Sequence, residues 1–450
     1  MLAPVALAAD LFAARQQMAL SLGWHIVIAA FGVGFPVLIV AAEWLGLRRD
    51  DRDLQLLARR WSKTLGVLFA VGAVSGTILS FELGILWPGM MGTFGDVWGL
   101  PFAIEGIAFF VEAIFIGIYL YGWDRLPPRL HLLTGIPIPI AGIASAWFVV
   151  SANAWMNQPR GFDIEHYLAT GEVTGVDPVA AMLNPATGPQ TTHMILATLM
   201  VSGFGVAAVY AWAHLRGRRD RYHRLGFLLP FAFAAAVTPV QIGVGDWMGR
   251  FLADQQPTKL AAIEGLYDTQ AGAPFTFGGW YDEEAEETRY GIEVPRLLSL
   301  LAQHDPDAVV LGLDQVPPDE RPPVNPVRLA FQFMVAVGFF LLALGAWFAW
   351  SWWRRRSLPR SRAFLWGAVA AGPLAVLAME AGWIVTEVGR QPWIVWEVMR
   401  VEEAVTQADG IRFGYFVLIG VYALLTVTTV LVLRRMWRTP QEAHAEGVER

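Results

Sequence analysis

Apolar residues along this chain gather into long runs that are separated by shorter polar segments. A bilayer core needs about 20 mostly apolar residues for each helical crossing. Nine runs reach that length, and we predict spans at 18–45, 63–86, 99–121, 132–153, 191–213, 225–248, 326–351, 363–386 and 412–433. The pattern therefore predicts an all-α integral membrane protein, a bundle of nine transmembrane helices.

Basic residues gather after alternate spans, which predicts the orientation of the bundle. Lys and Arg resist transfer across the bilayer and collect in short cytoplasmic loops. They follow the first, third, fifth, seventh and ninth spans, at 48–63, 125–129, 216–224, 354–362 and 434–438. We therefore expect the N-terminus on the periplasmic, outer side and the C-terminus on the cytoplasmic side.

The spans divide the chain into four predicted parts. Residues 1–248 hold spans one to six, 249–325 form a periplasmic loop, 326–433 hold spans seven to nine, and 434–450 form a cytoplasmic tail. The long loop is rich in Gly and Pro, and loops of this length are usually functional or disordered. We expect a short helix at 259–267 and a short interfacial helix at 5–17.

Composition supports the membrane class and excludes several kinds of site. Of the 450 residues, 55% are hydrophobic and only 16% charged. The chain has no cysteine, which excludes disulfides, iron–sulfur clusters, thiolate metal sites and c-type haem attachment. A net charge of -6 suggests neither nucleic-acid binding nor polybasic membrane docking.

Few ionisable side chains lie within the predicted spans. A charge at the bilayer centre costs about 2.5 to 3.5 kcal/mol, so each such group needs a partner, a proton or a metal. The ionisable residues that lie away from the inner ends of the spans are His25, Glu82, Glu105, Glu112, His193, Asp246 and Glu380. Met334 is added as a candidate soft ligand.

Four of these residues are candidate ligands of iron porphyrin. A rise of about 1.5 Å per residue places His25, His193, Met334 and Glu380 in the outer half of the bilayer, on four different helices. Imidazole and thioether together make a low-spin haem site, whereas one His or carboxylate leaves an open face for oxygen. The alternative is that the histidines are hydrogen bonders between helices and that the methionine fills the core.

Glu105 and Glu112 are seven residues apart in the third span. This spacing puts them on nearly the same helix face, with about 10 Å between them. Protonated buried carboxyls can pass protons without a permanent charge, so the pair predicts a proton relay. The alternative is a pair of protonated, hydrogen-bonded packing residues.

Six sequence blocks carry a resemblance to a known family. They are Arg15-Gln-Gln-Met-Ala with His25, Ala103-Ile-Glu-Gly with Phe-Phe-Val-Glu112, Gly122-Trp-Asp-Arg-Leu126, Ala152-Asn-Ala-Trp-Met156, Lys259-Leu-Ala-Ala-Ile-Glu264, and Glu380-Ala-Gly-Trp with Gly389-Arg-Gln-Pro-Trp393. From Arg15 to about Arg438 the chain resembles subunit I of cytochrome bd quinol oxidases.

The resemblance implies three haem groups and their ligands. His193 and Met334 would be the axial ligands of the low-spin haem b558. His25 and Glu380 would bind the high-spin haems b595 and d. Which residue binds which haem is left open, as is whether a haem b stands in place of haem d. Trp383 and Arg390 would contact the cofactors, the guanidinium of Arg390 pairing with haem propionates.

The resemblance also implies the reaction and its partners. Quinol would be oxidised at the periplasmic face, beside a Q-loop that carries Lys259 and Glu264. Oxygen would be reduced to water with cytoplasmic protons delivered by way of Glu112 and Glu105, which is electrogenic without a pump. The resemblance implies a second membrane subunit, subunit II. The presence of a small single-helix subunit is left open. The other partners are membrane lipid, quinol and O2.

The chain departs from the best-known branch of that family at three places, one of which is Ser80-Phe-Glu-Leu in place of a more acidic start. Gln332 stands where that branch has an Arg two positions before the axial Met. Glu105 and Glu112 are one residue closer together, which turns Glu112 by about 100°. With the short Q-loop, these features resemble the cyanide-insensitive branch.

Three other functions are alternatives to this one. A haem–copper oxidase needs more intramembrane histidines than the two found here, His25 and His193. A proton-coupled transporter would also keep acids in its spans but needs no Met ligand. A haem b anchor of a dehydrogenase would contain low-spin haem only.

Overall fold

A computed structural model describes residues 3–359 and 361–438 of the chain. Within these residues nine helices are long and apolar enough to cross a membrane, and each contains one of the predicted spans. The spanning elements are α1 (Ala3–Arg49), α2 (Arg52–Leu86), α3 (Pro88–Gly122), α4 (Pro128–Gly135) continued by α5 (Pro137–Asn157), α8 (Thr187–Leu215), α9 (Arg221–Gln255), α12 (Val324–Arg355), α13 (Arg362–Val388) and α15 (Ile411–Arg438). The predicted fold class is confirmed. Most of the predicted tail, from residue 439 onward, lies outside the described residues.

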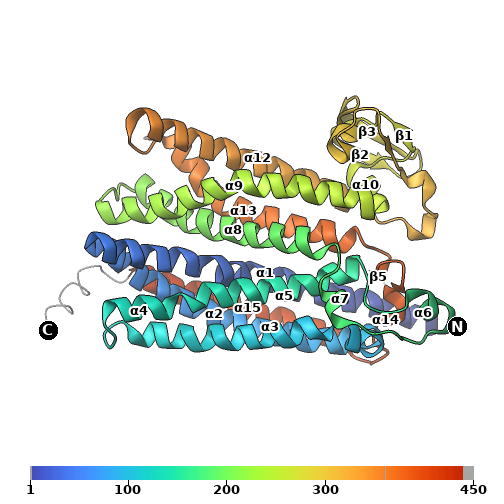
Figure 1. Cartoon of the computed structure of the whole chain (residues 1–450), viewed down its shortest axis with the longest axis horizontal. Coiled ribbons are helices and arrows are strands. Elements are labelled where there is room, and N and C mark those ends of the chain that lie inside the picture. The colour runs from blue at the N-terminus through green and yellow to red at the C-terminus, as the bar shows by residue number, and fades with distance from the viewer. Residues whose placement is uncertain (1–2, 360, 439–450) are drawn as a thin grey trace.

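Successive spanning helices run in opposite directions, so the bundle has two distinct ends (Figure 1). At one end α1, α8 and α12 finish in or beside arginines, and we call this the basic end. Residues 256–323 lie at the opposite end, which we call the loop end. The alternation predicted from the basic residues is therefore present in the structure.

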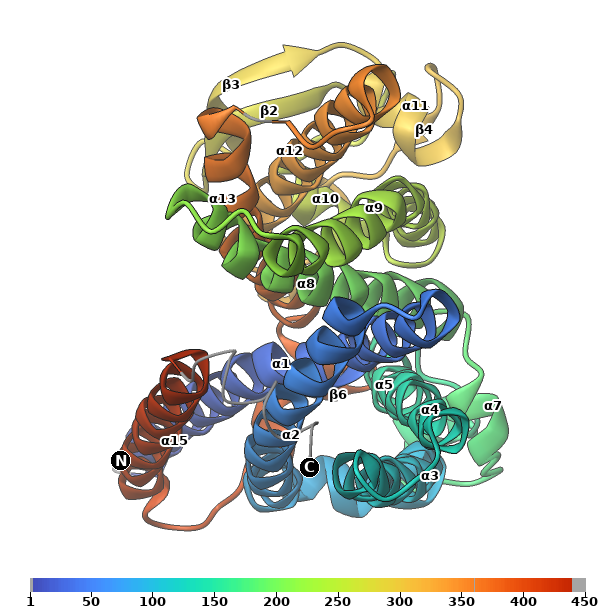
Figure 2. The same ribbon diagram turned by 90° about the vertical axis from the view of Figure 1, so that its left-hand side faces the viewer.

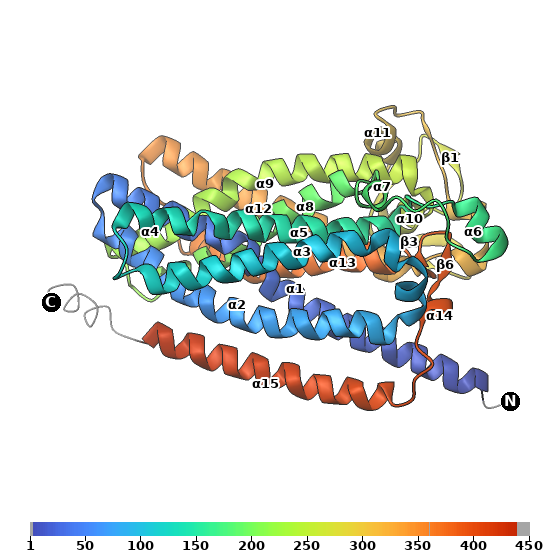
Figure 3. The same ribbon diagram turned by 60° about the horizontal axis from the view of Figure 1, so that its bottom comes forward.

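The helices form two groups that α1 joins. Helices α8, α9, α12 and α13 pack together, while α2, α3 and α5 lie on the other side of α1, and α15 lies outside against α1 and α2 (Figures 2 and 3). The largest apolar core fills the space between α1, α2, α8, α9, α12 and α13, where Phe204, Phe231 and Phe364 are fully buried. Burial of such large rings stabilises the bundle where helices, rather than lipid, surround the side chain.

Local sequence signals set where several helices begin. Asp51 accepts hydrogen bonds from the first backbone N–H groups of α2, and Asp220 does the same for α9. No such signal separates residues 5–17 from the first span, because no proline lies between residue 5 and Pro36. The interfacial helix expected at 5–17 is thus wrong as a separate element: it is the beginning of α1.

The long loop folds into a small domain at the loop end, residues 256–323, which we call the loop domain. Helix α10 (Pro257–Glu264) confirms the short helix expected at 259–267, although α9 extends to Gln255 and the loop therefore starts later than 249. Strands β2 (Phe275–Asp282) and β3 (Glu287–Val294) form an antiparallel hairpin in which Phe275 pairs with Val294.

Shorter elements complete the loop end. They are α6 (Ile164–Thr170), α7 (Pro178–Met182), β1 (Gln270–Ala271) paired with β4 (Val309–Val310), α11 (Leu297–Gln303), η1 (Leu313–Gln315), η2 (Pro318–Glu320), β5 (Trp393–Val395) paired with β6 (Met399–Arg400), and α14 (Val401–Ala404). Strands β5 and β6 follow α13, so the chain turns back at this end of the bundle after Val388.

Candidate functional site

His25 projects from α1 toward α2, where it contacts two small residues, Ser75 and Gly76. A β-carbon at Gly76 would lie 3.1 Å from Cε1 of the imidazole. The hydroxyl of Ser75 donates to the Gly72 carbonyl, 3.0 Å away, and its oxygen lies 2.8 Å from Nδ1 of His25. Since the hydroxyl proton is used by Gly72, Nδ1 donates to Ser75, which leaves the lone pair of a neutral imidazole on Nε2. That is the form in which imidazole binds metals.

His193 projects from α8 toward α9. A β-carbon at Gly245 would lie 3.5 Å from its Cε1. Its Nε2 lies 3.3 Å from the side-chain nitrogen of Gln241, and its buried Nδ1 has no protein partner. Sequence reasoning missed Gln241 because only ionisable side chains and Met334 were considered within the spans.

Met334 and Glu380 complete the set of four donors, and each also lies against a glycine of another helix. A β-carbon at Gly382 in α13 would come 3.1 Å from the sulfur of Met334 in α12. A β-carbon at Gly23 in α1 would lie 3.5 Å from Oε2 of Glu380. All four candidate donors thus lie against a glycine of another helix, where a side chain would crowd them.

Several residues predicted to bind a cofactor carry buried polar atoms without a protein partner. These atoms are Nδ1 of His193, Oε1 of Glu380, Nε1 of Trp383, and Nε and Nη1 of Arg390, which is 2% exposed. Buried polar atoms in folded proteins are almost always hydrogen-bonded, so unpaired ones indicate a group still to be bound. The cationic donors of Arg390 suit a carboxylate.

The donor set favours a macrocycle over a bare metal ion. In residues 3–359 and 361–438 no group of three or more His, Asp or Glu side chains is arranged to hold an ion. A porphyrin supplies the ring nitrogens itself and asks the protein for only one or two axial ligands. Isolated donors, each beside a glycine, fit haem.

Glu105 and Glu112 both face α5 and therefore share one face of α3, as their spacing predicted. Oε1 of Glu105 accepts a hydrogen bond of 2.9 Å from Ser145. Glu112 is 5% exposed, its Oε1 has no partner, and a β-carbon at Gly142 would lie 3.3 Å from it. Sequence reasoning missed Ser145, because a serine three residues from a glycine has no signal of its own in a span.

Two other acids of the predicted spans have different surroundings. Glu82 of α2 is buried and accepts a 2.9 Å hydrogen bond from Gln17 of α1. Asp246 pairs with Arg250 one turn along α9, where both side chains are 42% exposed. Neither acid touches the four donors in the described contacts, although the second carboxyl oxygen of Glu82 is also buried without a partner.

Lys259 lies in a buried polar network at the loop end. It is 2% exposed, and its ammonium donates to the side-chain oxygen of Asn157 at the end of α5. Burial and the nearby Arg390 lower the pKa of Lys259 to about 7, partly offset by Glu387. Near neutral pH this group can therefore both hold and release a proton.

Glu387 connects that network to Arg390. It accepts hydrogen bonds from the side chain of Asn153 and, at 2.5 Å, from Arg390. Sequence reasoning missed Glu387 because the residue lies beyond the predicted end of the eighth span. The network links α5, α10 and α13 at one level of the bundle.

Glu264 ends α10 and is 5% exposed. One of its carboxyl oxygens has no partner. Burial raises the pKa of Glu264 to about 8, although the nearby Arg328 acts in the opposite direction. The side chain is therefore a buried acid that is ready to exchange a proton slightly above neutral pH.

The first turns of α12 hold the hairpin of the loop domain. Asn325 binds both backbone groups of Tyr281. Arg328 is fully buried and donates to the carbonyls of Thr276, Gly278 and Glu264 at 2.6 to 3.1 Å. Gln332 accepts from the Gly278 N–H and donates to the Thr276 carbonyl, both at 2.8 Å. Gln332, two residues before Met334, thus anchors the loop domain.

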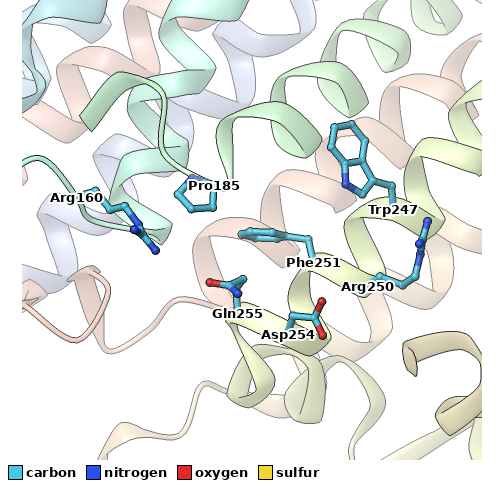
Figure 4. A pocket seen from close by; sticks show the side chains of 7 residues that line it. All are labelled: Arg160, Pro185, Trp247, Arg250, Phe251, Asp254 and Gln255. Atoms are coloured by element: carbon cyan, nitrogen blue, oxygen red, sulfur yellow. The ribbon is translucent and has the colours of Figure 1, made fainter. Parts of the chain in front are cut away.

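A cavity of about 400 Å³ opens at the loop end beside α9 (Figure 4). It is lined by Arg160, Pro185, Trp247, Arg250, Phe251, Asp254 and Gln255. None of the residues predicted from the sequence lines it. Its mixture of two aromatic rings with charged side chains is typical of a membrane–water boundary.

Comparison with known proteins supports the same reading of the chain. The family model described as "Cytochrome bd terminal oxidase subunit I" matches residues 13–441. The chain is 36% identical, over 95% of its length and 97% of the relative's, to the putative cytochrome bd menaquinol oxidase subunit I of Bacillus subtilis strain 168. It is 30% identical to the cytochrome bd ubiquinol oxidase subunit 1 of that organism, with 95% and 93% covered.

More distant and structural comparisons agree. The cytochrome bd-II ubiquinol oxidase subunit 1 of Escherichia coli strain K12 is 26% identical, over 94% of this chain and 95% of that protein. The solved bd oxidase from Geobacillus thermodenitrificans superposes with a TM-score of 0.88 at 39% identity, covering 95% of this chain and 98% of the other.

Proposed function

This chain belongs to the family of cytochrome bd terminal oxidase subunit I, and we propose from that premise that it carries the haem groups of an enzyme that oxidises quinol and reduces O2 to water. The observation that carries the proposal is the set of four metal donors, each set against a glycine of another helix. Family membership removes the haem–copper oxidase, transporter and dehydrogenase-anchor alternatives.

The four donors divide into a low-spin and a high-spin set. We assign His193 and Met334 to haem b558, and His25 and Glu380 to haems b595 and d, with their order and the presence of haem b in place of haem d open. Haem held by these residues would supply single-electron transfer and a site for O2. The Nε2 lone pair of His25 and the unpaired oxygen of Glu380 support these roles.

Residues around the donors orient the cofactors. Arg390 holds Nε and Nη1 free for a propionate while its remaining nitrogen is tied to Glu387. Trp383 keeps a buried N–H without a partner. Side chains fixed in this way orient a cofactor without giving up their own protein contacts.

Quinol oxidation belongs to the loop end in this proposal. Two quinols and one O2 give two quinones and two waters, so each quinol must release two protons. Lys259 and Glu264 are buried there with pKa values of about 7 and about 8, which suits groups that accept such protons. The anchor formed by Arg328 and Gln332 holds the loop domain over them.

Protons for water formation come from the opposite end. Glu112 and Glu105 face α5 along one side of α3 and pass these protons toward the high-spin haems. The basic end faces the cytoplasm by the distribution of Lys and Arg. Release of protons at one face and uptake at the other makes the reaction electrogenic without a pump.

The chain works in the bacterial cytoplasmic membrane with a partner. Family membership implies subunit II, whereas a small single-helix subunit stays open. Apolar side chains on α2 and α3 are exposed, such as Phe81 at 68% and Phe110 at 67%. They must be covered by lipid or by subunit II.

Spectroscopy with oxygen uptake tests this function. The complex is purified, its haems are extracted as pyridine haemochromes, and O2 consumption is followed with ubiquinol and menaquinol analogues. We expect low-spin and high-spin haem signals together with quinol-dependent O2 uptake. A haem-replete complex that consumes no O2 with either quinol would refute the proposal.

A further inference from the structure

Glu43, Tyr119 and His131 form a buried cluster at the basic end that no part of the mechanism above uses. They come from α1, α3 and α4 and are 2%, 1% and 2% exposed. Nδ1 of His131 lies 2.7 Å from Oε1 of Glu43, and the Tyr119 hydroxyl donates to Oε2 of Glu43 at 2.5 Å. Nε2 of His131 lies 2.9 Å from the backbone carbonyl of Tyr119.

The hydrogen bonds of this cluster require a shared proton. A carbonyl oxygen can only accept, so Nε2 of His131 must carry a hydrogen. If Nδ1 were bare and Glu43 ionised, two lone pairs would face each other at 2.7 Å in a buried place. One proton therefore lies between His131 and Glu43, as imidazolium with carboxylate or as imidazole with carboxylic acid. The cluster is a buried proton store.

Tyr119 aligns this store with the two acids of α3. Positions 105, 112 and 119 repeat every seven residues, so their side chains share one face with a drift of only about 20° per step. Successive members are about 10 Å apart along the helix axis. Glu105 meets Ser145, Glu112 meets Gly142, and Tyr119 packs on Gly135, where a β-carbon would come 2.8 Å from its ring.

The cluster lies one layer beneath the surface of the basic end. The His131 ring stacks on Tyr119 and lies tilted against Trp123, with ring centroids 4.4 and 4.2 Å away. Outside Trp123 lies the ion pair of Arg59 with Asp124, whose carboxylate is 72% exposed. A proton from the aqueous phase therefore has only this layer to pass before it reaches His131.

We propose that Glu43, His131 and Tyr119 form the site at which protons from the basic end are loaded before they pass to Glu112 and Glu105. The inference rests on the proposed function, because oxygen reduction is the step that consumes protons. A proton leaves the store through the Tyr119 hydroxyl and bound water, and Glu112 takes it up. Another proton from the aqueous phase replaces it; no electron moves and no other bond changes.

A purely structural role would tie α1, α3 and α4 together, so the experiment must separate proton delivery from folding. The whole complex, with its partner subunit, is fully reduced and mixed with O2. A pH-indicator dye follows proton uptake while haem absorption follows electron transfer. The variants are Tyr119→Phe, which removes one oxygen atom, Glu43→Gln, and Glu43→Asp, which restores a carboxyl.

Tyr210→Phe is the matched control, because it also removes a buried hydroxyl at the basic end. Tyr210 is 6% exposed and accepts a 2.9 Å hydrogen bond from Trp61, but it belongs to α8 and lies off the α3 line. We expect its proton uptake to match that of the unmodified complex.

For Tyr119→Phe and Glu43→Gln we expect proton uptake to slow about tenfold or more with unchanged haem spectra. Glu43→Asp should recover most of the rate. The inference is overturned if proton uptake in Tyr119→Phe stays within about twofold of the unmodified rate. It is also overturned if Tyr210→Phe slows uptake equally. If Glu43→Gln fails to assemble, Tyr119→Phe decides alone. An unmodified complex that consumes no O2 would instead refute the proposed function.

Discussion

The sulfur of Met334 lies against Gly382, where a β-carbon would come within 3.1 Å of it. Because the two residues belong to α12 and α13, the glycine sets how close the helices come at the candidate axial ligand. Gly382→Ala would push the thioether aside, and a displaced thioether binds iron less well. We expect the low-spin signal in the reduced-minus-oxidised spectrum to weaken or shift toward high spin.

Gly338→Ala is the control for that substitution. Gly338 lies in α12, one turn from Met334, and no atom lies within 4 Å of the position its β-carbon would take. The same chemical change should leave the spectrum intact there. Equal spectra for both alanine variants would contradict the role of Met334.

Ser75 should decide how firmly His25 holds its haem. It accepts from Nδ1 of His25 at 2.8 Å and so keeps the lone pair on Nε2. Loss of such an orienting partner typically lowers metal affinity about 10- to 100-fold. We expect Ser75→Ala to lose high-spin haem, measured as haem per polypeptide after washing in detergent. Ser80→Ala is the control, because the Ser80 hydroxyl donates only to the Gly76 carbonyl of its own helix. If Ser80→Ala loses as much haem as Ser75→Ala, Ser75 does not orient His25.

Gln332 should affect quinol binding rather than the haems. Its side chain makes two 2.8 Å hydrogen bonds to strand β2, and each such bond contributes about 0.5 to 1.5 kcal/mol. We expect Gln332→Ala to raise the KM for quinol severalfold, to speed limited proteolysis of the loop domain, and to leave kcat close to normal. Leu329→Ala, at a 42% exposed position of the same helix, provides the comparison. Unchanged KM and proteolysis would show that the anchor does not order the quinol site.

Glu264 should make the turnover rate increase with pH on the alkaline side of neutral. Its pKa of about 8 keeps the carboxyl protonated below that pH, and only the carboxylate above it accepts a proton from quinol. Turnover at saturating quinol should therefore increase with pH through this range, and Glu264→Gln should lose that increase. The rise from Lys259, centred near its pKa of about 7, should persist in the variant. An unaltered profile in Glu264→Gln would exclude Glu264 as the acceptor.

Stability gives an independent readout of the same carboxyl. The folded pKa of about 8 lies above the ordinary value of 4.5, so the folded state binds the proton more tightly than the unfolded chain does. Stability is then lost as pH rises from about 4.5 to about 8, because the buried carboxylate must be charged. Glu264→Gln should make thermal unfolding of the loop domain less sensitive to pH over that interval.

The sequence predicts the features that one helix carries by itself. Nine apolar runs are enough for the bundle, because length and hydropathy decide whether a helix crosses a membrane. The seven-residue spacing of Glu105 and Glu112 is enough to place both on one face, which the structure bears out through Ser145 and Gly142 of α5.

The sequence does not predict which residues meet across helices. Nothing local marks Gly382 as the neighbour of Met334, or Gln241 as the neighbour of His193. Each pairing depends on the rotation and depth of two helices, and these are set by packing of the whole bundle. Glu43 was left out because it lies at the inner end of the first predicted span, and its contact with His131, 88 positions away, has no local signal.

Replacement of the two residues assigned to the low-spin haem tests the central claim most directly. His193→Ala and Met334→Ala each remove one donor, and the complexes are compared by reduced-minus-oxidised spectroscopy with pyridine haemochrome analysis. We predict that each variant loses the low-spin signal while the high-spin absorption remains. A low-spin signal that survives intact in both variants would contradict the haem sites described here.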